Sequence, residues 1–430
     1  MMKYDIAIIG SGILGTTLSY WLSTLTSLRI CVFDKEHCEA QHASSRNTGV
    51  VHSPFYINPQ KKTIAKSTLL SHDLWKLLAL KNNIPWMKVG TIEVAINEKQ
   101  HNTLEKYLNW GVENGLDETE LYLFDHNQIS TKEPHVKCYS GIYCTRDVST
   151  DYGMLTNVMK NYSEKNMTDF FFNFEIKNII NYPDHTKLIF KNGREIIANF
   201  VINCAGGYSL DLAHKFNLAN EYSTINFRGD YIIASTHHGN LVNTNIYSVP
   251  EFEEYPFLDP HWIKKSNGNT EIGPTALPVI TPETYDGWIN NFRDIFYLFK
   301  HIKANTLKII FNSDFLTLAS KEFLSSISKT YMINRIKKFI PDVDPKYFVT
   351  KGTSGIRSQI ILNDGTFMND VLELYDHNSL HIINYNSPGA TGAPVYSASI
   401  VTKLHEKGFI KIKKNYTNIW DYDKILNTSN

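Results

Sequence analysis

The sequence has few cysteines and no excess of charge of either sign. Its 430 residues include 5 cysteines, an odd number without a C-x-x-C pair, which argues against a secreted disulfide framework and a zinc knuckle. The 43 basic and 43 acidic side chains cancel, which argues against broad electrostatic attraction to nucleic acid. We therefore expect free thiols in a reducing, cytoplasmic environment, no metal site and no nucleic-acid partner.

Long apolar runs are also absent. The N-terminal run spans four residues and ends in glycine, unlike a signal peptide, and no stretch of 18 apolar residues predicts a transmembrane helix. Residues 292–303 mix aromatic and basic side chains at helical spacing. This pattern fits either a packed helix with a solvated basic face or peripheral contact with the inner face of a membrane, and the first interpretation is favoured.

The N-terminal sequence predicts a β-α-β unit. An isoleucine-rich run at 4–9 is followed by a helical pattern at 13–25 and a second apolar run at 28–34, which together begin a doubly wound parallel sheet. Asn192-Gly193 is typical of a hairpin turn. Further helices are expected at 61–82, 101–115, 283–340 with breaks, and 393–407, and further strands at 89–96, 200–207 and 222–275.

A dinucleotide fingerprint lies between these first two strands. Gly10, Gly12 and Gly15 form G-x-G-x-x-G at the start of the predicted helix, and Asp34 ends the next strand. The glycines allow a tight turn and a close approach of the backbone to a pyrophosphate, which the N-terminus of the helix attracts. Asp34 can accept hydrogen bonds from ribose hydroxyls. The pattern predicts dinucleotide binding but does not distinguish FAD from NAD.

Three later segments favour FAD. They are a polar loop at 44–53, a strand with an Ala-Gly-Gly end at 201–209, and a glycine-rich loop at 386–394 before the last predicted helix. Each is also compatible with an ordinary turn or core strand. In a nicotinamide enzyme these glycines have no assigned role, whereas in an extended FAD site all three segments have one, the last by placing a helix N-terminus against the flavin.

Eight motifs carry a resemblance to a known family. In order they are DIAIIGSGILG, HASSRNTGVVHS, FVINCAGGY, FRGDYII, YPFLDPHW, EIGPTAL, GIRSQIILNDG and NSPGATGA. Together they resemble the L-2-hydroxyglutarate dehydrogenase/oxidase family, a branch of the D-amino-acid-oxidase-like flavoproteins, from about residue 4 to about 405. The chain departs from that family at residues 259–261, where Asp-Pro-His replaces Gly-Val-His, and at residues 388–391, where Pro-Gly-Ala-Thr replaces Pro-Ala-Ala-Thr.

The resemblance implies an α/β fold. It has a glutathione-reductase-type, Rossmann-like FAD-binding domain with an inserted substrate or cap domain of mostly antiparallel sheet plus helices. The predicted FAD-binding parts are residues 1–85, 151–220 and 346–430 with the C-terminal tail, and the predicted cap parts are residues 86–150 and 221–345.

Oxidation of a 2-hydroxy acid requires a base, a carboxylate anchor and a hydride acceptor. His261 and His52 lie in family-like motifs and are the predicted catalytic residues, because histidine transfers protons near neutrality. Arg357 is the predicted carboxylate anchor, since a guanidinium can clamp a carboxylate with two hydrogen bonds. Tyr247 and Lys351 are weaker pocket candidates.

The resemblance also implies a set of FAD contacts. Arg46 is predicted to hold the FAD phosphates or a second substrate carboxylate, and Ile176 to contact the adenine through its backbone. The full predicted set is Gly10, Gly12, Ile13, Leu14, Gly15, Asp34, Lys35, Ser45, Arg46, Asn47, Gly49, Val50, Ile176, Ala205, Gly206, Gly355, Arg357, Gly389, Ala390 and Thr391.

The leading functional prediction is FAD-dependent oxidation of an L-2-hydroxy acid, foremost L-2-hydroxyglutarate. Two alternatives use the same fold: a glycine/sarcosine-type amine or amino-acid oxidase, and a non-catalytic flavoprotein assembly factor. A plain NAD dehydrogenase is the weakest alternative. Oxygen, a quinone and an electron-transfer protein all stay open as electron acceptors, and FAD is expected to bind without a covalent link.

Overall fold

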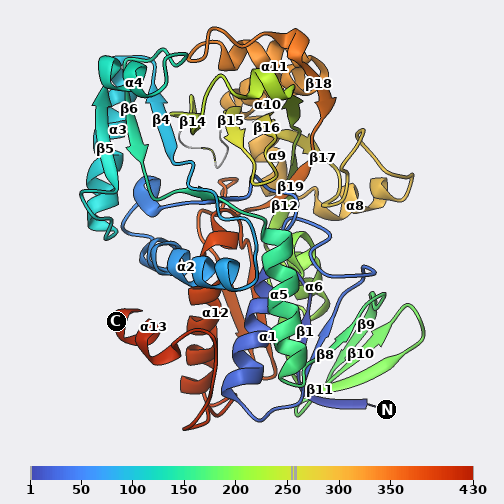
Figure 1. The fold of residues 1–430 in the computed structure, drawn as a ribbon. Coiled ribbons are helices and arrows are strands. Elements are labelled where there is room, and N and C mark those ends of the chain that lie inside the picture. The colour runs from blue at the N-terminus through green and yellow to red at the C-terminus, as the bar shows by residue number, and fades with distance from the viewer. Residues whose placement is uncertain (1, 253–254, 256–258, 430) are drawn as a thin grey trace.

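The computed structural model describes residues 2–252, 255 and 259–429, and it has two parts (Figure 1). Three residues of the YPFLDPHW motif, 256–258, lie outside the described residues. The first part is built on a sheet in the order β20-β21-β11-β1-β2-β8. These strands are β20 (Leu372–Asp376), β21 (Ser379–Ile383), β11 (Glu195–Asn203), β1 (Met2–Ile9), β2 (Ile30–Phe33) and β8 (Asp169–Phe171).

The predicted β-α-β unit is confirmed. β1 pairs in parallel with β2, Ile6 opposite Ile30, and with β11 on its other side. The connecting helix α1 (Ile13–Leu25) is buried along its whole length. It packs with α2 (Lys62–Lys81), α5 (Tyr152–Lys165) and α12 (Gly389–Glu406) on one face of the sheet (Figure 1). Because both faces of the central strands are covered, their sequences are continuously apolar.

The Asn192-Gly193 hairpin is also confirmed. It joins β10 (Thr186–Phe190) to β11, and Gly193 has a φ of +80°. One edge of β11 pairs with β10 in its first half and with β21 in its second half. With β9 (Ile176–Asn181), the hairpin covers the other face of the sheet, beside α6 (Ser209–Lys215).

The second part contains a mostly antiparallel sheet, as predicted. Its strand order is β18-β13-β16-β15-β14-β4-β6-β5, with only β14 and β4 parallel among the described pairs. The strands are β18 (Phe348–Lys351), β13 (Ile232–Ala234), β16 (Thr270–Gly273), β15 (His261–Lys264), β14 (Asn245–Ser248), β4 (Thr91–Ala95), β6 (Ser140–Cys144) and β5 (Leu121–Asp125).

Two small sheets lie in the second part and at its junction with the first part. One has the order β17-β12-β19, formed by β17 (Leu277–Val279), β12 (Ser223–Gly229) and β19 (Gly355–Ile361). The other pairs β3 (Val50–Val51) with β7 (Val148–Ser149). β18 and β19 pair with strands of the predicted cap. This pairing favours a third FAD-binding part that begins after Ile361 rather than at residue 346. The domain boundaries stay a prediction.

Several helix boundaries differ from the prediction. The stretch predicted as helical from 283 becomes helical only at α8 (Asp294–His301), followed by α9 (Ala304–Ile310), α10 (Ser313–Ile327) and α11 (Lys329–Ile336). α3 (Glu98–Glu113) starts earlier than predicted because the side chain of Asn97 caps it. α12 starts at Gly389, within the glycine-rich loop, and α5, α4 (His126–Lys132), α7 (Thr236–Gly239) and α13 (Tyr422–Ser429) were not predicted.

Within the described residues, no helix is both long and apolar enough to cross a bilayer.

Candidate active site and cofactor pocket

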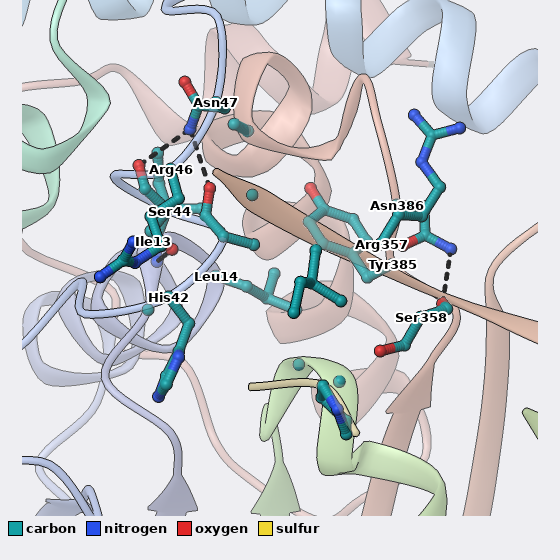
Figure 2. Close-up of a pocket in the computed structure, with 18 of the residues that line it drawn as sticks. Ile13, Leu14, His42, Ser44, Arg46, Asn47, Arg357, Ser358, Tyr385 and Asn386 are labelled. Carbon is teal, nitrogen blue, oxygen red and sulfur yellow. Dashed lines mark hydrogen bonds between the residues drawn. The ribbon is translucent and has the colours of Figure 1, made fainter. Parts of the chain in front are cut away.

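A cavity of about 640 Å³ lies between the two parts (Figure 2). Its lining extends from Asp34, directly after β2, to His261 in β15. One end is therefore formed by the first sheet and the glycine turn, and the other by the cap strands. We call these the dinucleotide end and the substrate end.

The glycine turn brings backbone to the cavity wall. Gly10 has a φ of +107°, and a Cβ atom there would lie 2.3 Å from the carbonyl oxygen of Cys204. A Cβ atom on Gly15 would lie 1.9 Å from the carbonyl oxygen of Gly10. Only glycine fits both positions, and the resulting turn leaves the N-terminus of α1 facing the cavity, where it favours phosphate. Gly12, Ile13 and Leu14 line the wall here.

Asp34 is held in a fixed orientation beside this turn. Its Oδ2 atom accepts hydrogen bonds from the backbone N–H and the hydroxyl of Ser11, at 2.7 and 2.6 Å. Its Oδ1 atom accepts one from the backbone N–H of Glu36 at 3.0 Å. The carboxylate still lines the cavity, so it is positioned to accept further hydrogen bonds from ribose hydroxyls.

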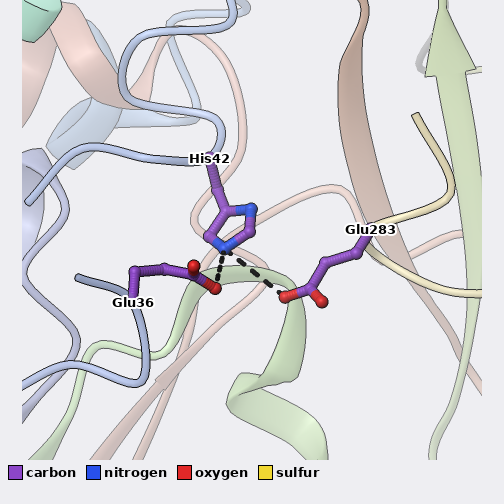
Figure 3. A group of neighbouring side chains, drawn as sticks. All are labelled: Glu36, His42 and Glu283. Atoms are coloured by element: carbon purple, nitrogen blue, oxygen red, sulfur yellow. Dashed lines mark hydrogen bonds and ion pairs between the residues drawn. The ribbon is translucent and has the colours of Figure 1, made fainter. Parts of the chain in front are cut away.

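An ion-pair cluster joins the two parts near Asp34 (Figure 3). His42 Nε2 lies 3.0 Å from Glu36 Oε1 and 3.4 Å from Glu283 Oε1, while His42 Nδ1 lies 2.7 Å from the Tyr285 hydroxyl. The donor set resembles that of a metal site, but the ammonium of Lys35 pairs with both carboxylates. The cluster therefore already has a compensating cation and ties the loop after β2 to the loop before α8.

Arg46 belongs to the dinucleotide end. Its guanidinium stacks over the Tyr285 ring at 4.1 Å, and its Nε and Nη1 donate to the carbonyl oxygens of Gln41 and Ser354 at 3.0 and 3.4 Å. A Cβ atom on Gly355 would lie 2.1 Å from the carbonyl oxygen of Arg46. Figure 2 shows Arg46 and Arg357 on opposite sides of the pocket. This separation favours phosphate over a substrate carboxylate as the ligand of Arg46.

Most of the residues predicted to contact FAD line the cavity. They come from β1 and the turn after it, the 40–50 loop, β9, the end of β11, β19 and the start of α12. The lining residues of the predicted set are Gly10, Gly12, Ile13, Leu14, Asp34, Lys35, Arg46, Asn47, Val50, Ile176, Ala205, Gly206, Gly355, Arg357, Ala390 and Thr391.

Four predicted contacts lie behind the wall instead. Gly15 packs on the backbone of the glycine turn, and Gly49 has a φ of +77° in its own turn. The Ser45 hydroxyl donates to a backbone carbonyl within its loop. A Cβ atom on Gly389 would lie 2.9 Å from the Tyr385 ring. These residues shape the backbone that forms the wall, because small side chains are needed where segments pack closely.

At the substrate end, His261 and Tyr247 form a stacked pair. Their ring centroids are 4.1 Å apart, and both side chains are buried. His261 Nδ1 lies 3.0 Å from the carbonyl oxygen of Asp259. A carbonyl only accepts, so Nδ1 carries the hydrogen and Nε2 keeps a lone pair. Within the described part of the chain, neither His261 Nε2 nor the Tyr247 hydroxyl has a hydrogen-bond partner.

Burial sets the protonation states of this pair. It is the main cause that lowers the pKa of His261 to about 3, against the opposing effect of the hydrogen bond to the Asp259 carbonyl. It raises the pKa of Tyr247 well above the ordinary value. Near neutral pH the pair therefore offers the cavity one acceptor, His261 Nε2, and one donor, the Tyr247 hydroxyl.

His52 follows β3 and lies against the same tyrosine. Its ring meets Tyr247 and Tyr56 edge-on, with centroid distances of 5.9 Å in both cases. Its backbone N–H donates to the Thr391 hydroxyl at 3.3 Å, which links it to the N-terminus of α12. Its Nδ1 atom lies 3.5 Å from Oδ2 of Asp147. His52 and His261, predicted separately from two motifs, are thus both at the substrate end.

Asp147 is a residue that sequence reasoning missed. It is completely buried between β6 and β7. Its carboxylate accepts hydrogen bonds from the Ser53 backbone at 2.7 Å and the Thr91 hydroxyl at 2.8 Å. Burial alone would raise the pKa of Asp147, but the hydrogen bonds from His52, Ser53 and Thr91 bring it below the usual value, so the carboxylate stays charged. No motif marks this residue, and its partners come from distant segments.

Arg357 lies in β19, opposite Phe227 of β12, and lines the cavity. Burial lowers its pKa, while the nearby Tyr56 and Tyr231 act in the opposite direction, and a guanidinium remains charged under both influences. Lys351, the other predicted cation, is exposed in β18 and pairs with Asp286 at 2.9 Å, so that prediction was wrong.

The Asp-Pro-His departure places Asp259 in a second ion-pair network. Arg335 of α11 pairs with Asp259 and, at 2.6 Å, with the buried Glu322 of α10. The Asp259 carbonyl in turn accepts the hydrogen bond of His261 Nδ1. Two cap helices therefore fix the backbone that orients His261.

The cavity fits FAD, the cofactor that the resemblance implies. The glycine cradle at Gly10 has no room for a Cβ atom, and Asp34 and the N-terminus of α1 face the cavity beside it. The N-terminus of α12, at Ala390 and Thr391, contributes a second helix end to the wall. Phosphates and the reduced flavin both carry negative charge, which these helix ends favour.

Comparison with known proteins agrees with this assignment. The sequence profile of the family described as FAD dependent oxidoreductase matches residues 5–404. Similar curated proteins are the mitochondrial L-2-hydroxyglutarate dehydrogenase of Nematostella vectensis, at 27% identity over 94% of this chain and 91% of that one, and that of Homo sapiens, at 26% over 94% and 89%. The L-2-hydroxyglutarate dehydrogenase of Salmonella houtenae is 26% identical over 93% of both chains.

Solved structures agree on the fold. The L-alpha-glycerophosphate oxidase of Mycoplasma pneumoniae with FAD bound has a TM-score of 0.75 at 21% identity, covering 97% of this chain and 98% of that one. The glycine oxidase of Geobacillus kaustophilus has a TM-score of 0.69 at 16% identity, covering 99% and 98%. The predicted fold class is therefore confirmed.

Proposed function

The chain belongs to the family of FAD dependent oxidoreductases, and from this premise we propose that it oxidises an L-2-hydroxy acid, foremost L-2-hydroxyglutarate to 2-oxoglutarate. The observation that carries the proposal is the substrate end of the cavity, whose wall includes Arg357, His52 and the unpartnered polar atoms of His261 and Tyr247. The similarity to three L-2-hydroxyglutarate dehydrogenases over more than nine-tenths of the chain supports this choice of substrate.

Each side chain has a role that its chemistry allows. Arg357 would hold the carboxylate next to the reacting carbon with paired hydrogen bonds. His261 and His52 would both face the substrate hydroxyl, whose single hydrogen goes to one of the two rings, and Tyr247 would donate a hydrogen bond to a substrate oxygen. These contacts would fix the orientation of the reacting carbon in the cavity.

The cofactor would be held by the dinucleotide end. The backbone at Gly10, the N-terminus of α1 and Arg46 would hold the pyrophosphate, and Asp34 the ribose. When bound, FAD supplies the hydride acceptor of the reaction.

A substrate panel tests the proposal. The purified flavoprotein is mixed anaerobically with L-2-hydroxyglutarate, its D-enantiomer, glycerol 3-phosphate, glycine or sarcosine, and the flavin absorbance is followed. We expect bleaching by L-2-hydroxyglutarate, with the D-enantiomer far slower. Bleaching by glycine or sarcosine alone would support the amine-oxidase alternative, and no bleaching by any compound would support the non-catalytic one.

We also propose contact with an anionic membrane surface through α8 and the segment before it. Phe292, Phe296 and Phe299 are spaced as one helical stripe and are 75%, 69% and 71% exposed. Exposed Trp288 extends the stripe toward Phe323 of α10, with ring centroids 5.5 Å apart. Lys300, near the end of α8, is about half exposed and suits acidic headgroups, although it also pairs with Asp211, whereas His301 is buried beside the same carboxylate.

Membrane contact would bring the site close to a lipid-soluble quinone as the electron acceptor. Flotation with vesicles of anionic and of neutral lipid tests the contact, and quinone reduction on the same vesicles tests the acceptor. We expect binding to anionic vesicles that is lost when Phe296 and Phe299 are both changed to serine. Binding that survives this change would contradict the proposal, and rapid reduction of oxygen but not quinone would contradict the acceptor.

A further inference from the structure

The two histidines at the substrate end differ in their buried partners. His261 Nδ1 donates to a neutral backbone carbonyl, whereas His52 Nδ1 faces the carboxylate of Asp147 at 3.5 Å. A carboxylate stabilises an imidazolium, and a carbonyl in an apolar setting does so much less. The two rings therefore have different capacities to keep a proton.

We propose that Asp147 is a positioning residue that holds His52 with Nδ1 protonated, so that His52 Nε2 receives the proton of the substrate hydroxyl. This inference rests on the proposed oxidation. The O–H bond breaks, its proton moves to His52 and a C=O bond forms, while the C2 hydrogen with its electron pair would go to FAD, which supplies the hydride acceptor when bound. Electrons and protons balance, and Asp147 itself stays ionised.

The surroundings of Asp147 fit this role. Its carboxylate is completely buried and is fixed by the Ser53 backbone and the Thr91 hydroxyl, so it cannot turn away to solvent. The Cys144 thiol adds a weak contact at 3.5 Å. Burying a charged carboxylate costs free energy unless hydrogen bonds or an opposite charge compensate it. Among the groups that contact Asp147, only His52 can become a cation.

Other ionisable groups near His52 do not supply this charge. Burial raises the pKa values of Tyr56 and Tyr247, which keeps both neutral. The lowered pKa of His261 keeps that ring neutral, and Arg357 is a cation that cannot stabilise a second one. Glu93, on the neighbouring β4, interacts electrostatically with the two tyrosines.

The test is a double-mutant cycle on the flavin-loaded enzyme. We expect Asp147→Asn to slow flavin reduction by about 10²-fold or more, and to move the acid limb of the kcat/KM profile to lower pH. Asp147→Asn should add less than about twofold to His52→Ala, because the carboxylate acts through that ring. Additive losses, or an unshifted acid limb, would assign Asp147 a purely structural role and overturn the proposal.

A control is another Asp–His pair of this chain, one that lies away from the cavity. Asp73 lies 3.2 Å from His72 Nδ1 outside the cavity, and its carboxylate is largely exposed. Asp73→Asn should leave the rate and the pH profile unchanged. A fall equal to that of Asp147→Asn would indicate a general effect of losing such a pair.

A second readout does not depend on turnover. Nitrogen-15 NMR of histidine-labelled protein, with His52→Ala to assign the signal, reports the tautomer of His52. We expect one tautomer, with the hydrogen on Nδ1, in the wild type and a mixture in Asp147→Asn. A wild-type mixture would overturn the proposal even if Asp147→Asn failed to fold. A single tautomer without bleaching by L-2-hydroxyglutarate would instead refute only the proposed substrate.

Discussion

The two ends of the cavity are built in different ways. The dinucleotide end depends on backbone: a glycine turn, helix N-termini, and a carboxylate held by Ser11 of that turn and by the backbone of Glu36. The substrate end depends on side chains from β14, β15, β19 and the segment after β3, which belong to three different sheets. Backbone recognition leaves a compact glycine pattern in a sequence, whereas side chains gathered from several sheets do not.

The two ends also differ in how their charged and polar groups are paired. Around Lys35, two carboxylates, an imidazole and an ammonium are paired with one another. At the substrate end, His261 Nε2 and the Tyr247 hydroxyl are buried without a partner within the described residues. A buried polar atom without a partner costs about 1–3 kcal/mol, so such atoms indicate a place where a ligand supplies the missing hydrogen bonds.

The largest expected effect is at the dinucleotide end. Gly10→Ala would place a Cβ atom 2.3 Å from the Cys204 carbonyl oxygen in a left-handed conformation. We expect almost complete loss of bound flavin, measured as the ratio of flavin to protein absorbance. Gly193→Ala is the control, because that Cβ atom would meet nothing within 4 Å; full flavin content in Gly10→Ala would contradict the assigned cradle.

A smaller effect, confined to substrate binding, is expected at Arg357. Arg357→Met removes the carboxylate anchor, so KM for L-2-hydroxyglutarate should rise by about 10²-fold with flavin content unchanged. Lys351→Met, on an exposed lysine outside the cavity, should leave KM unchanged. Apo-protein after Arg357→Met would show that this arginine serves the cofactor, and would remove the contrast between the two ends.

His261→Gln should slow flavin reduction by about 10- to 10²-fold, because it removes the ring that stacks on Tyr247 and lines the substrate end. The variant also has an effect on stability. The pKa of His261 is about 3 in the folded protein and about 6.5 when unfolded. Below pH 6.5 the unfolded chain binds the additional proton, so wild-type stability falls as pH decreases toward 3, whereas above pH 6.5 this group contributes no dependence.

His261→Gln should therefore flatten that acid dependence. Urea unfolding at pH 7 and pH 5 measures it: the loss of unfolding free energy between the two should be smaller in the variant by about 2 kcal/mol. An equal loss in both proteins would mean that His261 is not held neutral by burial.

The smallest effect is expected at Asp259, which acts on His261 through the backbone. Asp259→Ala removes one of the two carboxylates that pair with Arg335. We expect kcat to fall by less than about 10-fold with little change in KM, and Asp259→Asn to recover most of the loss because it can still accept a hydrogen bond. A steady-state comparison of the three proteins measures this, and a rise in KM alone would place Asp259 in substrate binding.

Local patterns predicted much of the first part. The run at 4–9, the glycine turn and the run at 28–34 lie next to one another along the chain, and the structure forms the expected unit from them. The start of α12 was predicted four residues late because its first six residues include two glycines and a proline, which lower helix propensity. Packing on α2 and α1 overrides that propensity.

The sequence by itself determined the dinucleotide fingerprint, the α/β class and the motifs that hold His52, His261 and Arg357, because these depend on neighbours along the chain. Only the tertiary structure showed that the two histidines lie at one end of a cavity and that Lys351 lies outside it. It also showed that Asp147 lies next to His52. Asp147 lies 95 positions from His52 in an unremarkable segment. Its burial, and hence its electrostatic effect, exists only after the cap strands have paired.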